Sequence, residues 1–316
     1  MHKTYIRIIP FIAFFAVFAL LTITIANSFP AHAAQSTVNL RSASPFAILS
    51  GTPNITDAGN ASVINGNVGL SPATGAGIGL TCSQVSGAIY SVDATGPLPC
   101  RQNNGPLMVT AKDDLTTAYT DAAGRTPLTT VPTELGGTTL VAGVYDSSST
   151  TFGITAGAGA LTLDGQNDPS SVFIFEAPFN GTGLTVGSGS TVTLTNGAQA
   201  CNVFWRVDTA AINSTANFVG TVLALNSISV ANGATIQGRL LARNGNVTLI
   251  NDTITTSICA GNDTTSGETG TDDGIIPGLP NTGLVSERSL LVTLILAALL
   301  VISSIVTYIV YKKRSI

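Results

Sequence analysis

Two stretches of the chain repeat one pattern of apolar and polar positions, offset by 18 residues. Residues 216–226 read Ala-Asn-Phe-Val-Gly-Thr-Val-Leu-Ala-Leu-Asn, and residues 234–244 read Ala-Thr-Ile-Gln-Gly-Arg-Leu-Leu-Ala-Arg-Asn, so that Gly220 matches Gly238. A period near 20 residues, with short β-type runs that end at Asn and Gly corners, is typical of a solenoid. The pattern predicts an all-β, right-handed parallel β-helix in which each repeat forms one turn.

A third copy of the pattern lies far upstream. Residues 63–68 (Val-Ile-Asn-Gly-Asn-Val) share an Ile-x-Gly-x-apolar core with residues 236–240. We therefore expect the first coil to stack against the last coils, out of sequence order. Because side chains alternate along a strand, Ile236, Gly238 and Leu240 should point into the solenoid. The alternative is a Gly- and Thr-rich β-sandwich.

One segment has a helical rather than a β-type period. Over residues 110–123, Thr110 and Asp113 approximate a capping box, and Gly124 is a natural stop. The apolar positions fall on one face, which predicts a long helix packed against the outside of the solenoid. Residues 71–106 are rich in Gly and Pro, and we interpret them as a cap or loop insertion over one end. The apolar face comprises Ala111, Leu115, Ala118, Tyr119 and Ala122.

The first 33 residues have the layout of a secretory signal peptide. Lys3 and Arg7 precede an apolar run over residues 8–25, and the segment ends in Ala-His-Ala at residues 31–33, a suitable cleavage site. We expect the protein to be exported and the mature chain to begin at Ala34 or Gln35. An N-terminal membrane anchor is the alternative.

After an acidic linker over residues 260–278, the C-terminal end carries three features in a fixed order. They are a pentapeptide, a transmembrane segment at residues 290–311 and a basic cytoplasmic tail at residues 312–316. The pentapeptide is Leu279, Pro280, Asn281, Thr282 and Gly283. This arrangement resembles the cell-wall sorting signal of Gram-positive-type bacteria. The resemblance implies that a sortase cuts after Thr282 and joins the protein to peptidoglycan; a plain membrane anchor is the alternative.

Four cysteines agree with an exported protein, because an even number outside the cell favours disulfides. Three pairings are possible. We favour a bridge from Cys82 to Cys100 around the loop-rich segment, and one from Cys201 to Cys259 that ties an inner coil to the end of the solenoid. A metal site is disfavoured, because no two cysteines have C-x-x-C spacing.

The remaining composition argues against catalysis and nucleic-acid binding. The only histidines, His2 and His32, lie in the predicted signal peptide, which removes the usual nucleophile and general-base schemes. Residues 34–282 hold seven Lys and Arg against sixteen Asp and Glu, an excess of nine negative charges that would repel phosphate. We therefore expect no enzyme, no cofactor and no nucleic-acid partner.

Two long motifs stand out: residues 196–205 (Asn-Gly-Ala-Gln-Ala-Cys-Asn-Val-Phe-Trp) and 238–248 (Gly-Arg-Leu-Leu-Ala-Arg-Asn-Gly-Asn-Val-Thr). Four shorter ones are at residues 44–49, 63–68, 114–119 and 168–175. These motifs, the two long ones most specifically, resemble those of the microbial ice-binding protein family, which has a right-handed, out-of-order β-helix with one flanking helix. The similarity covers most of residues 34–259, which we assign as an ice-binding-like domain.

The resemblance implies that one flat face binds ice, often through T-A/G-x-T/N-like steps. Short hydroxyl and methyl groups on a rigid strand lose little side-chain entropy on binding. The step preceding Leu161 lacks a hydroxyl. A wall-anchored adhesin that binds glycans or cells is the main alternative, which a surface-exposed Trp205 or Phe218 would favour; a purely structural wall protein is another. The candidate ice-binding residues are Ser62, Ser188, Thr191, Ser214, Asn217, Asn232 and Thr235.

Overall fold

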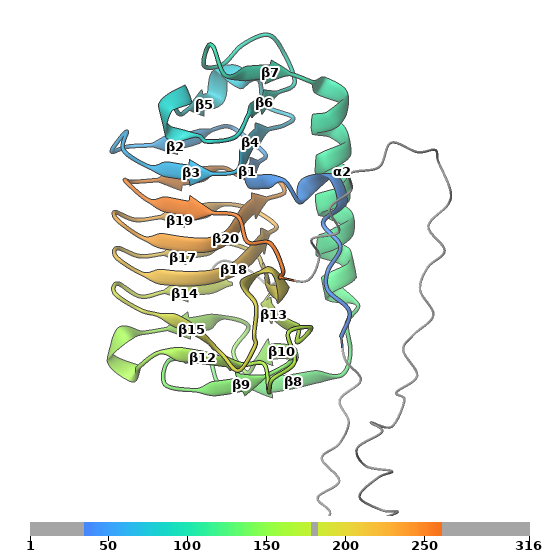
Figure 1. Cartoon of the computed structure of the whole chain (residues 1–316), viewed down its shortest axis with the longest axis vertical. Coiled ribbons are helices and arrows are strands. Elements are labelled where there is room, and N and C mark those ends of the chain that lie inside the picture. The colour runs from blue at the N-terminus through green and yellow to red at the C-terminus, as the bar shows by residue number, and fades with distance from the viewer. Residues whose placement is uncertain (1–34, 178–182, 261–316) are drawn as a thin grey trace, which may run out of the picture. The chain divides into compact units, whose positions relative to one another are not determined.

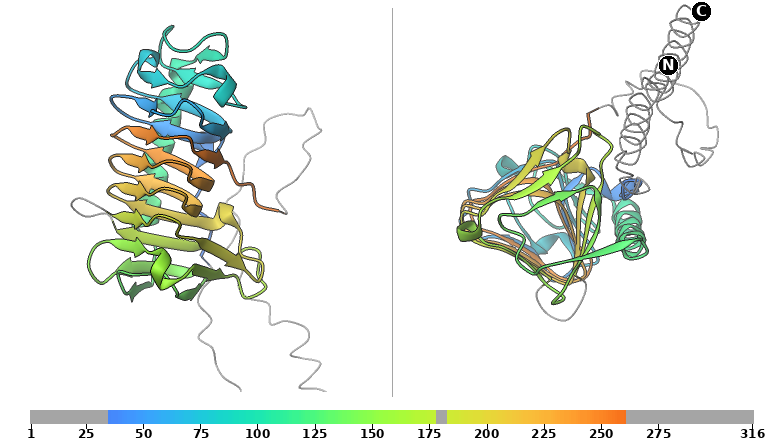
Figure 2. Two further views of the ribbon diagram at one scale, coloured as in Figure 1. Left: turned by 90° about the vertical axis from the view of Figure 1, so that its left-hand side faces the viewer. Right: turned by 90° about the horizontal axis from the view of Figure 1, so that it is seen from below.

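The computed structural model describes residues 35–177 and 183–260, which form parallel β-sheets around one elongated core with one α-helix alongside (Figure 1). Sheet A has twelve strands, sheet B seven and sheet C three. Viewed along the stack, the sheets enclose a roughly triangular core (Figure 2). The chain passes from one sheet to the next and returns to the first, which is the arrangement of a β-helix.

The main path of sheet A is β7 (Arg101–Asn103), β6 (Ile89–Ser91), β4 (Asn67–Leu70), β1 (Phe46–Ser50), β20 (Thr235–Ala242), β18 (Asn217–Ala224), β16 (Val203–Val207), β13 (Phe173–Ala177), β10 (Gly143–Ser147) and β8 (Leu128–Val131). Sheet B contains β11 (Phe152–Ile154), β14 (Leu184–Val186), β17 (Ala210–Ile212), β19 (Ile228–Val230), β21 (Val247–Leu249), β2 (Ile55–Asp57) and β5 (Ile78–Gly79). Sheet C contains β15 (Val192–Thr195), β12 (Leu161–Asp164) and β9 (Thr139–Val141).

The third side of the stack is built from sheet C, the first halves of β18 and β20, and two further strands. These are β22 (Thr253–Thr255), which pairs with β20, and β3 (Val63–Asn65), which pairs with β22. The short 3₁₀ helices are η1 (Arg41–Ala43), η2 (Gly75–Gly77), η3 (Cys82–Gln84), η4 (Ala156–Ala158) and η5 (Ala200–Asn202).

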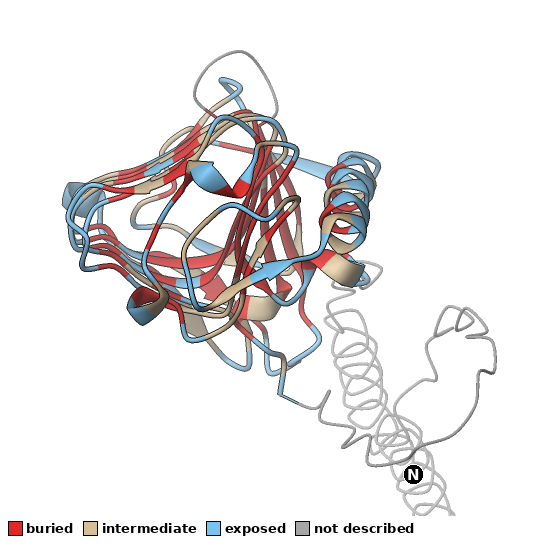
Figure 3. Cartoon of the chain, turned by 90° about the horizontal axis from the view of Figure 1, so that it is seen from above, coloured by how far each residue is buried: buried red, intermediate tan, exposed pale blue. Residues whose placement is uncertain are grey.

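Alternation of side chains fixes which residues fill the core. In β14, Leu184 and Val186 are buried while Thr185 between them is exposed, as expected for a strand with one face inward. Aromatic rings stack on one another inside the solenoid: the Phe175 and Trp205 ring centroids lie 3.9 Å apart. Figure 3 shows buried residues along the inner walls and exposed residues on the outer surface.

The repeat found in the sequence is confirmed as two adjacent coils. Strands β18 and β20 pair over their full lengths, with Gly220 opposite Gly238. Ile236 and Leu240 are buried in the core as predicted. The out-of-order closure is also confirmed, because β1 pairs with β20, β2 with β21 and β3 with β22.

The predicted helix is present, but it begins earlier than residue 110. Helix α2 covers Gly105–Ala123, and its N-cap is Asn104, whose Oδ1 accepts a hydrogen bond from the Leu107 N–H at 3.1 Å. The Thr110 and Asp113 capping box is wrong: Thr110 Oγ1 donates to the Pro106 carbonyl inside the helix. The predicted start of the helix is five residues too late, because the sequence interpretation assigns Pro106 to the preceding loop. Proline is in fact well suited to the first helical turn.

Helix α2 lies against the outer surface of sheet A, and its predicted apolar face is buried there together with Met108. Outward-pointing residues of sheet A, among them Phe204 and Leu223, complete this second hydrophobic cluster. Arg206 fastens the C-terminal end of the helix: its Nε donates to the Tyr119 carbonyl at 3.1 Å and its Nη1 pairs with Glu176 at 3.2 Å. Helix α2 therefore covers the outer surface of sheet A from β6 to β10.

Both predicted disulfides are confirmed, Cys82–Cys100 and Cys201–Cys259. Residues 71–106, interpreted as a cap or loop insertion, contribute β5, β6 and β7, which extend sheets A and B at one end of the stack (Figure 1).

The predicted terminal segments (residues 1–33, 279–283, 290–311 and 312–316) lie outside the described residues, as does all but Ala260 of the linker at residues 260–278. Within residues 35–177 and 183–260, no helix combines the length and apolar character that a membrane crossing requires.

Candidate functional site

The outer surface of sheet B carries one continuous row of small side chains. Six strands contribute their central residue and the two-residue strand β5 contributes Gly79, and ladder pairing places these residues directly side by side. Their side chains are exposed or half-buried, and none is charged. We call this set the sheet B row. It consists, in stacking order, of Gly153, Thr185, Ala211, Ser229, Thr248, Thr56 and Gly79.

The geometry of the sheet B row follows from the fold. Neighbouring strands of a sheet are spaced by about 4.8 Å, so hydroxyl and methyl groups recur at that interval along the stack. The strand residues on either side of each row position point into the core, as Ile228 and Val230 do around Ser229. Each row position is therefore held on both sides by buried neighbours, which limits its movement.

The predicted ice-binding residues fall into three groups. Thr191, Asn217 and Thr235 form a register row on the third side of the stack, which continues to Thr253. Ser188, Ser214 and Asn232 lie in the turns between sheet B and the third side. These turns are stacked by backbone hydrogen bonds, for example from the Gly189 N–H to the Ser214 carbonyl at 2.9 Å and from the Thr215 N–H to the Asn232 carbonyl at 3.1 Å.

Ser62 is misplaced by the sequence interpretation, because its side chain is only 1% exposed. Its Oγ accepts a hydrogen bond from the Asp252 N–H at 2.9 Å, and its own N–H donates to Asp57 Oδ2 at 2.9 Å. Ser62 thus holds the first coil against the last coil and cannot contact an external surface. The structure brings the other six predicted residues together along one edge of sheet B.

The sequence interpretation did not select the hydroxyl residues of the sheet B row. The Asn and Gly residues of the repeats mark the turns, so the predicted residues lie in or next to the turns and not on the strands of sheet B. The overlooked signal is a single small polar residue between two apolar ones, as in Leu-Thr-Val at 184–186, Ile-Ser-Val at 228–230 and Val-Thr-Leu at 247–249. The residues missed in this way are Thr56, Thr185, Ser229 and Thr248.

Two buried carboxylates lie beneath the edge formed by these turns. Burial raises the pKa of Asp252, although the N–H groups of Ile250 and Ala234 donate to it. Burial also acts to raise the pKa of Asp57, but hydrogen bonds from the N–H groups of Ser62 and Asn251 and from Gln84 hold it below the usual value. Both side chains are occupied by internal hydrogen bonds and stabilise the junction of the first and last coils.

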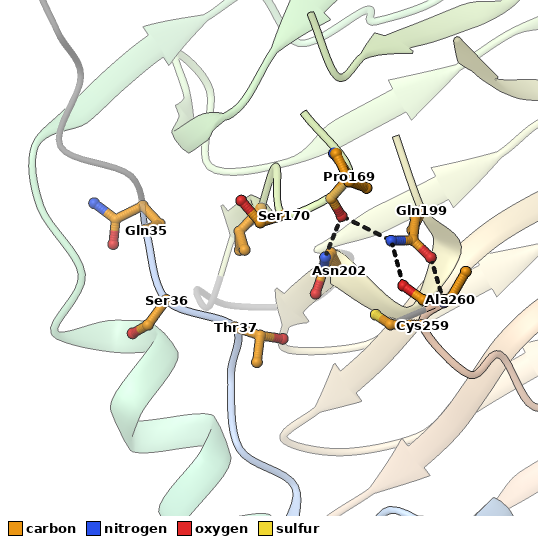
Figure 4. A pocket seen from close by; sticks show the side chains of 10 residues that line it. Gln35, Ser36, Thr37, Pro169, Ser170, Gln199, Asn202, Cys259 and Ala260 are labelled. Carbon is orange, nitrogen blue, oxygen red and sulfur yellow. Dashed lines mark hydrogen bonds between the residues drawn. The ribbon is translucent and has the colours of Figure 1, made fainter. Parts of the chain in front are cut away.

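The part of the chain that the structure describes contains no group of three or more His, Cys, Asp or Glu side chains that could hold a metal ion. A pocket of about 340 Å³ lies beside Cys259 of the Cys201–Cys259 bridge (Figure 4). Its amides serve the chain itself: Gln199 donates to the Pro169 carbonyl at 2.8 Å, and its Oε1 accepts from the Ala260 N–H at 2.6 Å.

The two aromatic residues that would favour sugar binding are both buried. Trp205 is 0% exposed and Phe218 is 1% exposed. Trp205 Nε1 donates to the Val219 carbonyl at 3.0 Å, so its polar atom is also satisfied inside the core. Phe204 points out of the solenoid but lies beneath helix α2. The adhesin alternative therefore loses the feature that would have favoured it.

The fold and this surface define a class of protein, a parallel β-helix with a flat, uncharged row of small side chains on a broad sheet that no helix among residues 35–177 and 183–260 covers. Residues 48–255 match the ice-binding-like family, and the chain belongs to that family. An ice-binding protein from a Colwellia species is 44% identical over 192 residues, which cover 60% of this chain and 72% of that protein.

Solved structures agree with this membership. The crystal structure of an ice-binding protein from an Antarctic biological consortium has a TM-score of 0.60 and 36% identity, and the match covers 71% of this chain and 93% of that one. A domain of ice-binding protein 1 from Shewanella frigidimarina has a TM-score of 0.61 and 29% identity, over 71% of this chain and 99% of that one.

Proposed function

We propose that this protein binds ice through the sheet B row and the turns beside it. The observation that carries the proposal is the register of the row: seven small, uncharged residues follow one another strand by strand without interruption. A regular array of hydroxyl and methyl groups at about 4.8 Å spacing can order water near lattice positions. Long charged side chains would hold their own hydration shells instead.

Comparison of the three sides of the stack favours sheet B. Helix α2 covers the outer surface of sheet A from β6 to β10, on one side of the stack. On the third side Val219 is buried, and the longer or charged side chains of Gln237 and Asp164 project outward. The row of Thr191, Asn217 and Thr235 lies next to the turns of sheet B, and we propose that it extends the ice-binding surface around this edge.

We further propose the setting in which the surface acts. The order of pairing and the strong preference for right-handed crossovers in parallel β-structure support a right-handed β-helix. The signal-like start and the Leu-Pro-Asn-Thr-Gly sequence support export, cleavage after Thr282 and attachment to peptidoglycan. On a wall-anchored protein, adsorption to ice would hold the cell against ice or stop crystal growth at the cell surface. The relatives and solved structures that the chain resembles are named as ice-binding proteins, which supports a protein that is not an enzyme.

Ice-affinity partition of the segment from residue 34 to residue 260 tests ice binding, and thermal hysteresis measures its strength. Thr248→Tyr places a large ring at the centre of the sheet B row and should abolish crystal shaping; Thr235→Tyr at the adjoining edge should reduce it. Thr117→Tyr is the matched control, because Thr117 is exposed on helix α2, away from sheet B. Equal activity in all three variants would refute the proposed surface.

Attachment is tested separately by fractionating cells that express the full chain. Sorting predicts protein that is released by digestion of the wall and lacks the residues after Thr282. Full-length protein in the membrane fraction, with none bound to wall, would refute sorting without affecting the proposal of ice binding.

A further inference from the structure

The last strand of the domain leaves from the middle of the stack rather than from an end. Strand β22 lies between β20 and β3 and pairs with each over three residues. Residues 256–260 then run along the stack, from β3, where the Thr256 N–H donates to the Asn65 carbonyl, to Gln199, whose Oε1 accepts from the Ala260 N–H. Unless another connection carries it, a pull on the chain beyond Ala260 is applied to a short strand at the junction between the last and the first coil.

Loss of β22 would open this junction. Ile254, at the centre of the strand, is fully buried and lies in register between Ile236 and Ile64. If β22 were pulled out, two buried isoleucines would lose their neighbour, and β3 would lose its partner strand. The domain would then be weakest at the point where its C-terminal tether begins.

A covalent connection bypasses β22. Cys259 is bonded to Cys201, which lies in η5 immediately before β16. Strand β16 pairs with β13 over five residues and with β18 over four, and its Trp205 is fully buried. Cys201 is therefore fixed to a coil held on both sides by longer ladders than those of β22.

We infer that the Cys201–Cys259 bridge is a mechanical clamp, which carries force from the C-terminal tether into β16 and keeps it off β22. The inference rests on the proposed attachment of the chain, since only a tethered domain bound to ice is pulled in this way. We call residues 256–260, which follow β22, the exit segment. Without the bridge it is held by separate hydrogen bonds, such as those from Arg239 Nη2 to the Ser257 carbonyl at 3.0 Å and from the Thr256 N–H to the Asn65 carbonyl at 3.1 Å.

The second disulfide supplies a matched control. Cys82 and Cys100 are separated by 18 residues and lie in the segment at one end of the stack. Neither belongs to β16, β22 or the exit segment. The double substitution C82S/C100S therefore removes a bridge of the same kind without changing the path between the tether and sheet B.

Single-molecule force spectroscopy on the detergent-solubilised full chain tests the clamp. One handle is attached at the C-terminal residue, and the other at position 229 in the centre of the sheet B row, which imitates a load between ice and the tether. The wild type and C82S/C100S should show no extension before the coils unfold. C201S/C259S should show an early step of about 2 to 3 nm at lower force, the length of residues 253–260 when extended.

Wild-type protein reduced after folding should show the same early step, which separates loss of the clamp from misfolding of the double variant. The inference is overturned if C201S/C259S and reduced wild type unfold at the wild-type force without an early step, or if C82S/C100S shows the step as well. Neither ice nor cell wall takes part in this measurement, so its outcome is independent of the tests of ice binding and attachment.

Discussion

The side-chain amide of Asn65 donates a hydrogen bond to Thr255 Oγ1 at 3.0 Å, although 190 residues of sequence separate them. The contact joins the first coil to the last one, and the same junction contains the buried carboxylates Asp57 and Asp252. The strands of the first coil, β1 to β3, pair with β20 to β22, which come last in the sequence. The N-terminal and C-terminal coils therefore meet in the middle of the stack. We expect its coils to unfold together rather than one after another from the C-terminus.

Ile254→Ala tests this cooperativity. The side chain is fully buried between two other isoleucines in register, so its truncation should cost about 2 to 5 kcal/mol of unfolding free energy. Calorimetry should show one transition at lower temperature. Thr255→Ala, on the exposed side of the same strand, should change stability by about 1 kcal/mol or less. A separate low-temperature transition for the last coil would contradict a single folding unit.

Close approach of the backbone explains why glycine recurs at the matched positions 220 and 238. A Cβ atom on Gly238 would lie 1.9 Å from the Gly220 carbonyl oxygen, which belongs to the paired strand and cannot move aside cheaply. Gly238→Ala should therefore destabilise the domain by about 3 kcal/mol or more, measured by denaturant unfolding. Gly157→Ala is the control, since nothing lies within 4 Å of its added Cβ. Similar stability of the two variants would show that the coils are not this tightly stacked.

The sequence was informative where local pattern and tertiary structure coincide. The 18-residue repeat predicted the pairing of β18 with β20, and the distant third copy predicted the out-of-order closure, because each copy carries a large inward apolar residue (Phe218, Ile236 or Ile64) and a Gly two residues later. The start of helix α2 was missed because Asn104 and Pro106 are equally good loop residues. Ser62 was misplaced because its burial depends on Asp57 and on Asp252, whose proximity only the closed stack reveals.

Lys112 joins helix α2 to sheet A, and its titration should contribute to the pH dependence of the unfolding free energy. Its Nζ donates to the carbonyls of Ala242 at 2.7 Å and Arg243 at 2.6 Å. Burial, with repulsion from Arg243 as a second cause, lowers the pKa of Lys112 from 10.5 to about 7. Between these values the unfolded chain binds a proton that the folded protein does not, so the contribution of Lys112 to stability should rise from pH 7 towards pH 10.5.

Denaturant unfolding of the wild type and Lys112→Met between pH 6 and pH 10 measures this contribution. The difference in unfolding free energy between the two proteins removes the effect of other titrating groups, such as Tyr119. It should be constant below pH 7 and shift in favour of the wild type as the pH increases. A difference that stays constant over the whole range would show that Lys112 keeps its ordinary pKa in the folded protein.

Ala211 permits the sharpest test of the sheet B row, because it lies between Thr185 and Ser229 and is the only apolar side chain larger than hydrogen in the row. Ala211→Thr completes the array of hydroxyls and should preserve or increase thermal hysteresis. Ala211→Asp places a charge at the same point, where a carboxylate would organise its own hydration, and should lower thermal hysteresis at least several-fold. Position 211 is half-exposed, so both variants should keep a melting temperature close to that of the wild type. If Ala211→Asp melts normally and still shapes ice as the wild type does, sheet B is not the ice-binding surface.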